Sequence, residues 1–167
     1  MDLWLRILIL AVLSYALGNW SMARMIAWNY RRVDIATKGS GNPGTMNMIR
    51  NFGYGKGAAT LVLDVIKGAT PALLGGLFLE YAYHEGGAFY FSHLGVYIGG
   101  LSVILGHMFP VVFKFKGGKG VACGIGVFFV ANPLMMLIVF AVMTFIFVFL
   151  EYGFVASLVG ILSMTVI

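Results

Sequence analysis

Charge is scarce in this sequence. Only 10% of its 167 residues are Asp, Glu, Lys or Arg, whereas 60% are hydrophobic. A soluble domain needs a charged surface, and this chain has too few charges to supply one. The mean hydropathy is +0.94, which is typical of a protein embedded in a membrane. The composition therefore excludes an ordinary soluble domain and predicts an all-α, polytopic bundle of five to six membrane helices.

Cysteine is almost absent as well. Cys123 stands alone, so no disulfide framework can form, and its small apolar neighbours predict a packed structural thiol.

The positive charges are unevenly placed. Ten of the eleven Lys and Arg lie between Arg24 and Lys119, and none follows Lys119. Nucleic-acid binders carry basic surfaces on soluble folds, so we expect no nucleic-acid partner. The clustered charge indicates cytoplasmic loops, phosphate binding, or both.

Three apolar stretches are long enough to cross the hydrocarbon core, which takes about 20 helical residues; they are Leu5–Trp28, Gly57–Leu79 and Leu94–Val112. Five Lys and Arg follow the first stretch (29–56), none follows the second (80–93), and three follow the third (113–119). The positive-inside rule then places both basic loops on the cytoplasmic face and the N-terminus outside. We expect the two loops to share one face of the membrane.

The last third of the chain allows two interpretations. Residues 121–130 are apolar but few, Asn132-Pro133 interrupts them, and 134–150 are long enough to span. Either a short, partly inserted helix follows the second basic loop, or residues 121–150 form one kinked unit. A further span begins at Phe154 and stops after fourteen residues. Small residues in the spans should let helices pack closely, notably Gly95, Gly99, Gly120 and Gly124.

Two glycine-rich basic loops carry the candidate chemistry. The first contains Gly39-Ser40-Gly41-Asn42-Pro43-Gly44, and the second contains Lys116-Gly117-Gly118-Lys119-Gly120. Glycine-rich backbone can turn successive N–H groups toward one anion, and a following helix adds its positive end. Asn47 and Arg50 are three residues apart, so on a helix they share a face that points back at the first loop. Simple turn chemistry also explains Ser40 and Asn42, but the added Arg50 and Lys119 favour phosphate binding.

Several familiar sites are excluded. The G-x-G-x-x-G pattern at Gly39 follows a membrane helix rather than a strand, so it is not a dinucleotide site. No Ser or Thr follows Lys119, as a Walker A loop requires, and G-x-S-x-G is absent. Val112 stands where the acidic residue of an H-x-x-x-x-D motif would follow His107. No other His, Cys, Asp or Glu stands at ligand spacing from His107, so we predict no metal site and no cofactor.

Two charged residues lie inside the second span. A lone charge at the membrane centre costs on the order of 3 kcal/mol on insertion scales. Asp64 and Lys67 are spaced i, i+3 and can pair, and we favour a role in bracing the first loop over direct catalysis. His107 lies near the inner end of the third span, where a hydrogen-bonded packing role is commoner than that of a base.

Four ordered motifs resemble the bacterial acyl-phosphate:glycerol-3-phosphate acyltransferase family (PlsY-like). They are the segment from Gly39 to Asn47, Asp64-x-x-Lys67-Gly68, Gly106-His107-x-Phe109-Pro110, and Lys116-Gly117-Gly118-Lys119-Gly120-Val121-Ala122. The resemblance implies transfer of a fatty acyl group from acyl phosphate to the sn-1 hydroxyl of glycerol 3-phosphate, which yields lysophosphatidic acid for phospholipid biosynthesis. It also implies a seven-helix bundle in the bacterial inner membrane, surrounded by lipid, with its site facing the cytoplasm.

The resemblance assigns catalysis to Ser40, Arg50 and Lys119. We expect the remaining site residues to bind substrate phosphate (Gly39, Gly41, Asn42, Gly44, Asn47, Gly117, Gly118 and Gly120) or to support the site (Asp64, Lys67 and His107). Family members continue through a seventh helix to a motif with a histidine and an asparagine. We therefore expect residues 1–167 to be a single integral membrane acyltransferase domain without its C-terminal part. The alternatives are a small transporter or channel for a phosphorylated anion, and a structural subunit whose loops attract anionic lipid.

Overall fold

The computed structural model describes residues 1–80, 92–150 and 158, and the regular structure in that part of the chain is helical throughout. The α-helices are α1 (Leu3–Gly18), α2 (Met22–Arg31), α3 (Thr45–Phe52), α4 (Tyr54–Glu80), α5 (His93–Met108), α6 (Val121–Ala131) and α7 (Pro133–Leu150). Two single 3-10 turns, η1 (Ile35–Thr37) and η2 (Val111–Phe113), lie in the loops. The predicted all-α bundle is confirmed.

Three stretches are long and apolar enough to cross a membrane: Leu3–Arg31, Tyr54–Leu79 and His93–Phe113. They correspond to the three spans predicted from the sequence. The first, however, was wrongly expected to be one helix, because α1 ends at Gly18 and α2 begins at Met22. Ser21 caps α2, its hydroxyl accepting a hydrogen bond of 3.4 Å from the Arg24 backbone N–H. Gly18-Asn19 followed by Ser21 combines a helix stop with a helix start, so the break was visible in the sequence.

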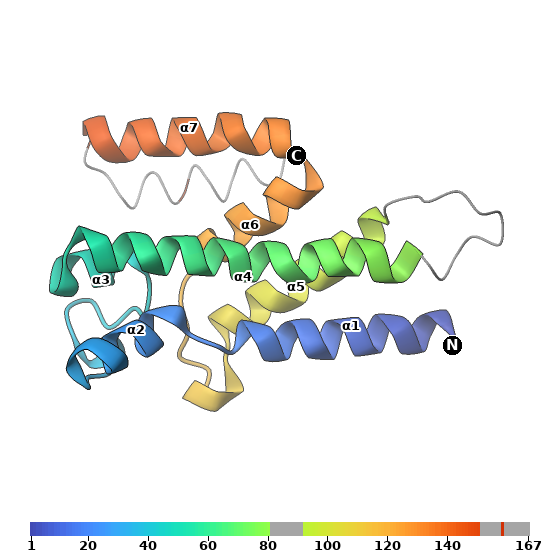
Figure 1. Ribbon diagram of the computed structural model, residues 1–167, viewed down its shortest axis with the longest axis horizontal. Coiled ribbons are helices and arrows are strands. Elements are labelled where there is room, and N and C mark those ends of the chain that lie inside the picture. Colours follow the sequence, from blue (N-terminus) through green and yellow to red (C-terminus); the bar gives the residue numbers. More distant parts are fainter. Residues whose placement is uncertain (81–91, 151–157, 159–167) are drawn as a thin grey trace.

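The core lies where α4, α5 and α6 meet. Ala72, Val96, Val103 and Val127 form a buried apolar cluster there. Helices α1 and α4 run along the long axis of the molecule, and α5 crosses obliquely (Figure 1); the three helices approach one another closely. A Cβ added at Gly95 would collide with the backbone of Gly75, which shows that α4 and α5 meet backbone to backbone. The predicted role of Gly95 in close helix packing is confirmed.

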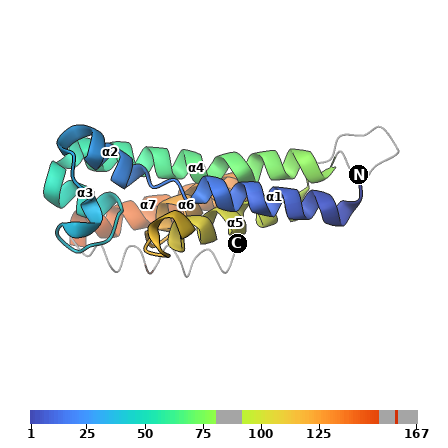
Figure 2. The same cartoon turned by 90° about the horizontal axis from the view of Figure 1, so that it is seen from below.

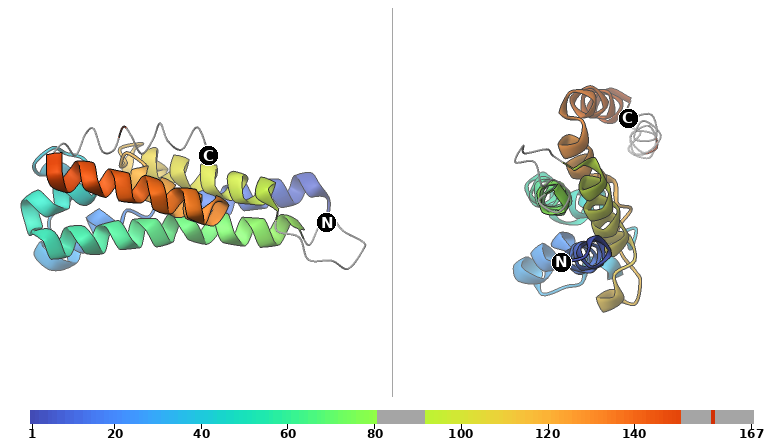
Figure 3. Two further views of the ribbon diagram at one scale, coloured as in Figure 1. Left: turned by 90° about the horizontal axis from the view of Figure 1, so that it is seen from above. Right: turned by 90° about the vertical axis from the view of Figure 1, so that its right-hand side faces the viewer.

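Helices α6 and α7 are separate elements, so a short helix follows the second basic loop, as the first interpretation of residues 121–150 expected. The helices part at Asn132, whose side-chain oxygen accepts a hydrogen bond of 3.2 Å from Met135 N–H in the first turn of α7. Seen end-on (Figure 3), α7 lies outside the group formed by α1, α4 and α5, with α6 between them. Apart from residue 158, the span predicted from Phe154 onward lies outside the described residues.

Both basic loops lie away from the N-terminus. Figures 1 and 2 show α2, α3 and the segment between α5 and α6 gathered toward the other end of the long axis. This is the arrangement expected if α1, α4 and α5 cross the membrane in alternating directions. The fold therefore positions the two glycine-rich segments to act together.

Candidate functional site

The first glycine-rich loop is organised by one buried amide. Asn47, on α3, is 1% exposed. Its Nδ2 donates to the carbonyl oxygens of Ile35 at 3.2 Å and Lys38 at 2.9 Å, and its Oδ1 accepts from the Ser40 backbone N–H at 3.1 Å. Asn51 Nδ2 donates to the same oxygen at 3.0 Å. The Asn47 amide is therefore engaged by the protein itself, and it sets the path of the loop around Ser40.

The loop also depends on left-handed backbone. Gly39 has φ of +52° and Gly41 has φ of +74°, a region that other residues adopt only with strain. A Cβ on Gly39 would in addition collide with the Asn47 side chain. Gly44 precedes the first turn of α3, and the Asn42 amide lies beside it. The glycines thus permit a tight turn that leads directly into a helix N-terminus.

The second glycine-rich loop folds back onto the end of α5. The Gly118 N–H donates to the carbonyl oxygen of His107 at 3.1 Å. A Cβ on Gly117 would collide with that carbonyl, and one on Gly118 would collide with the His107 ring. Gly120, with φ of +81°, then opens α6. This loop can therefore follow its path only with glycine against the histidine.

A buried polar cluster lies beneath the second loop. Lys67 Nζ is 3.0 Å from Asp64 Oδ1 and 3.0 Å from His107 Nδ1, and it donates to the Trp20 carbonyl at 2.8 Å. The Lys67 and Asp64 side chains are only 1% and 2% exposed. The contact to Asp64 is an ion pair without hydrogen-bond geometry. The predicted pairing of Asp64 with Lys67 is confirmed, and the ammonium also holds the break between α1 and α2.

The spatial neighbours of His107 correct one inference from spacing. Asp64, His107 and Cys123 place three possible metal-ligand atoms within 4.8 Å of one another, although no such group stands near His107 in sequence. The Lys67 ammonium contacts two of the three groups and already supplies a positive charge there. We therefore keep the expectation that no metal binds here, now on the ground of charge rather than spacing.

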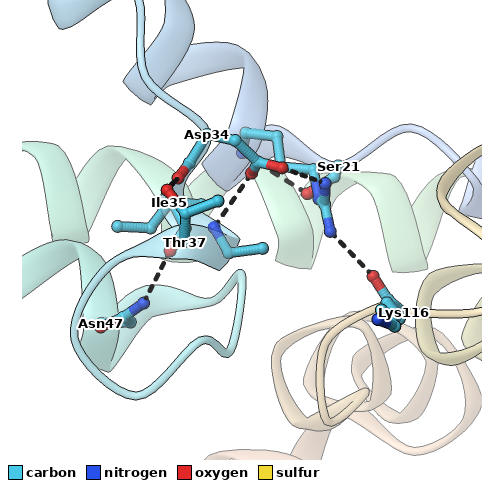
Figure 4. Close-up of polar contacts among 8 residues, drawn as sticks. Ser21, Asp34, Ile35, Thr37, Asn47 and Lys116 are labelled. Carbon is cyan, nitrogen blue, oxygen red and sulfur yellow. Dashed lines mark hydrogen bonds and ion pairs between the residues drawn. The ribbon is translucent and has the colours of Figure 1, made fainter.

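Arg24 on α2 links the two loops, and the sequence did not reveal this role. Its Nη1 lies 2.6 Å from Asp34 Oδ2, beside η1, and its Nη2 donates to the Lys116 carbonyl at 3.1 Å. Figure 4 shows this bridge from Asp34 across to Lys116. The Arg24 guanidinium also lies 4.2 Å from the centre of the Phe113 ring. Arg24 is ten residues from Asp34 and 92 from Lys116, and no motif connects such positions.

A mainly apolar pocket of about 380 Å³ lies beside this bridge. Trp20 and Trp28 line it from the first span, Val33 from the first loop and Phe113 from the second, with Arg24 and Asp34 as its charged members. Such a pocket could accept an apolar group next to an anion.

The predicted catalytic side chains lie at the surface, Ser40 and Lys119 on the two loops and Arg50 on α3. Ser40, Arg50 and Lys119 are all exposed, whereas Asn47 and the supporting residues Asp64, Lys67 and His107 are buried. The exposed groups can be reached by a ligand from the aqueous side, and the buried ones shape the loops. The sequence grouped Asn47 with the phosphate ligands, and its hydrogen bonds now favour a structural role.

The family model described as glycerol-3-phosphate acyltransferase matches residues 8–167. The glycerol-3-phosphate acyltransferase of Clostridioides difficile (strain 630) is 37% identical over 154 residues, covering 92% of this chain and 72% of that protein. That of Aquifex aeolicus (strain VF5) is 35% identical over 159 residues, or 95% and 77% of the two chains.

Solved structures agree with these relatives. The crystal structure of PlsY (YgiH), an integral membrane glycerol 3-phosphate acyltransferase, in its glycerol 3-phosphate form has a TM-score of 0.79 and 34% identity, and covers 96% of this chain and 74% of that one. The lysophosphatidic acid form of the same protein has a TM-score of 0.76 at the same identity and coverage. The membrane helix bundle, its paired glycine-rich loops and these matches together show that the chain belongs to the glycerol-3-phosphate acyltransferase family.

Proposed function

We propose that this protein transfers a fatty acyl group from acyl phosphate to the sn-1 hydroxyl of glycerol 3-phosphate, which yields lysophosphatidic acid. The observation that carries the proposal is the meeting of two cationic, glycine-rich loops at one end of an apolar bundle, linked by Arg24. Both substrates carry phosphate, and one also has a tail that stays in lipid. A site between cationic loops and the membrane can bind the phosphate of both substrates while the acyl chain of the donor stays in lipid.

Acyl phosphate is already activated, so the protein need not form a covalent intermediate with the acyl group. The glycerol hydroxyl attacks the acyl carbonyl carbon, a new ester C–O bond forms, and the bond from that carbon to the phosphate oxygen breaks. Inorganic phosphate leaves, and the hydroxyl proton passes to a phosphate oxygen of the substrates. The protein's task is to hold both phosphates in register and to stabilise the charge that develops on the carbonyl and leaving oxygens.

We assign these tasks to the exposed groups of the two loops and of α3. Arg50 offers a planar fork for one phosphate, Lys119 a mobile point charge, and Ser40 a hydroxyl donor. Backbone N–H groups at Asn42, Gly117 and Gly120 can add neutral donors. Those of Gly41, Gly44 and Gly118 already donate to protein carbonyls, so these glycines shape the loops rather than bind phosphate through their N–H groups. The apolar pocket beside Arg24 suits the first carbons of the acyl chain.

The same features support a location in the bacterial inner membrane with the site facing the cytoplasm. Positive charges follow the first and third spans and are absent between the second and third. Water-soluble glycerol 3-phosphate would then reach the loops from the cytoplasm, and the lipid donor would reach them from the inner leaflet.

One assay tests the function. Purified protein in lipid vesicles receives acyl phosphate and labelled glycerol 3-phosphate, and the product is separated from the substrate by extraction into organic solvent. Labelled lysophosphatidic acid supports the enzyme. Label trapped in the vesicle lumen without product would instead indicate a transporter. The absence of both product and trapped label would indicate a structural subunit.

Lys119→Ala tests the site assignment within that assay. Loss of a charge aimed at the transition state should lower transfer by at least about a hundredfold. Lys56→Ala is the matched control, since its ammonium lies 4.6 Å from the centre of the Tyr30 ring and has no proposed part in the site. Full transfer by Lys119→Ala would remove the proposed role.

A further inference from the structure

The Arg24 contacts are placed next to both glycine motifs. Lys116, whose carbonyl accepts from Nη2, directly precedes Gly117-Gly118-Lys119. Asp34, which pairs with Nη1, stands five residues before Gly39. One guanidinium therefore touches the chain just upstream of each loop that we expect to grip phosphate.

The Asp34 end of this contact is held firmly. Asp34 Oδ1 accepts from the Ala36 backbone N–H at 2.9 Å, and its carbonyl accepts from the Thr37 hydroxyl at 2.8 Å. The other carboxylate oxygen is the one that meets Arg24. Because Asp34 caps the η1 turn, a shift of its side chain would also shift the backbone that leads into the first loop.

The hydrogen bond to the Lys116 carbonyl depends on the orientation of the Arg24 guanidinium plane. The Phe113 ring lies beneath Arg24 at 4.2 Å, so the fork is fixed in orientation as well as position. The two nitrogens of a planar fork point in fixed directions, one to the carboxylate and one to the carbonyl. A lysine at this position could satisfy one of these partners but not hold both at a set separation.

We propose that Arg24, together with Asp34, is a positioning residue that sets the separation of the two phosphate-binding loops. The inference deepens the proposed acyl transfer and rests on it for its kinetic consequence. Arg24 acts on the substrates only through the loops. A change of about 1 Å in the relative position of reacting groups can cost on the order of a hundredfold in rate. We call the contacts of Arg24 with Asp34 and Lys116 the clasp, and we expect its loss to lower kcat more than it raises KM for either substrate.

Steady-state kinetics provide the first test. Arg24→Lys, Arg24→Gln and Asp34→Asn should each lower kcat by about tenfold or more, while KM for each substrate changes by less than about threefold. Asp34→Asn is informative because the asparagine oxygen can still accept from Ala36 N–H, so the η1 turn survives while the charge is lost. Arg6→Gln is the control, since its Nε donates to the Met1 carbonyl near the N-terminus.

A distance measurement separates the clasp from the enzyme assignment. Spin labels on cysteines introduced at Lys38 and Val112, both exposed, report the separation of the loops in lipid nanodiscs. Cys123 is fully buried and out of reach of the label. The distance distribution should broaden or shift in Arg24→Gln and Asp34→Asn, and it should remain as in the parent in Arg6→Gln.

The outcomes are distinct. Unchanged distances in Arg24→Gln, or full kcat in Arg24→Lys, would overturn the clasp. Changed distances together with reduced kcat would support it. A parent protein that forms no lysophosphatidic acid would contradict the proposed function, and the distance measurement would still decide whether Arg24 sets the loop separation.

Discussion

Replacement of Lys67 by methionine is the most direct test of the buried cluster. Methionine has a similar length but no charge, so Asp64 would be left as a buried carboxylate without its cation. Removal of one member of a buried ion pair costs about 3–5 kcal/mol, and this estimate already includes the stranded partner. The hydrogen bond to the Trp20 carbonyl is lost at the same time. By the usual scaling for a chain of this size, such a loss corresponds to a fall in Tm of roughly 6–20 °C.

The double variant Asp64→Leu with Lys67→Met makes the test quantitative. It removes both charges, so the stranded-charge penalty disappears and only the unmet Trp20 carbonyl and His107 Nδ1 remain, at about 1–3 kcal/mol each. The Tm of the double variant should therefore lie above that of Lys67→Met alone. Thermal unfolding in detergent, followed by the fluorescence of a reporter dye or by circular dichroism, measures both.

Two results would refute this reasoning. The first is a Lys67→Met protein with the Tm of the parent, because it would mean that the ammonium stabilises nothing. The second is a double variant less stable than either single variant, because it would mean that the charges act independently. A Lys67→Arg variant is a useful companion, since it retains the charge but must fit a larger fork into a closed site.

Further predictions concern the loops and the helix contacts. Gly118→Ala should lower transfer by at least about tenfold with little change in Tm, because the new methyl group would displace the loop from the His107 ring; unaltered kinetics would contradict this. Gly95→Ala should lower Tm because its Cβ would collide with the α4 backbone, whereas Gly55→Ala, with open space around it, should not; equal Tm values would argue against the close contact. Asn47→Ala should destabilise the first loop by about 1–3 kcal/mol by leaving buried carbonyls unmet, visible as faster hydrogen exchange of the Ser40 amide than in the parent.

The membrane spans were predictable because they depend on local composition. A stretch of about 20 apolar residues favours helix in lipid, and all three predicted stretches are present, although the first is divided between α1 and α2. The pairing of Asp64 with Lys67 was predictable from local sequence as well, since residues three apart are neighbours on the surface of a helix. The break after Gly18 was missed although its capping residues were present, because the continuous apolar sequence on both sides favoured a single long helix.

The shape of the site was settled by contacts between distant segments. The carbonyl that meets Arg24 is 92 residues away, and the imidazole that meets Lys67 is 40 residues away. Neither distance corresponds to a period of a helix, so only the packing of α2 against the loops and of α4 against α5 brings these groups together. Local composition thus determined which segments are apolar enough to span a membrane and which residues we propose for phosphate binding. Tertiary packing alone decided how the two loops are held together, because long-range contacts leave no spacing in the sequence.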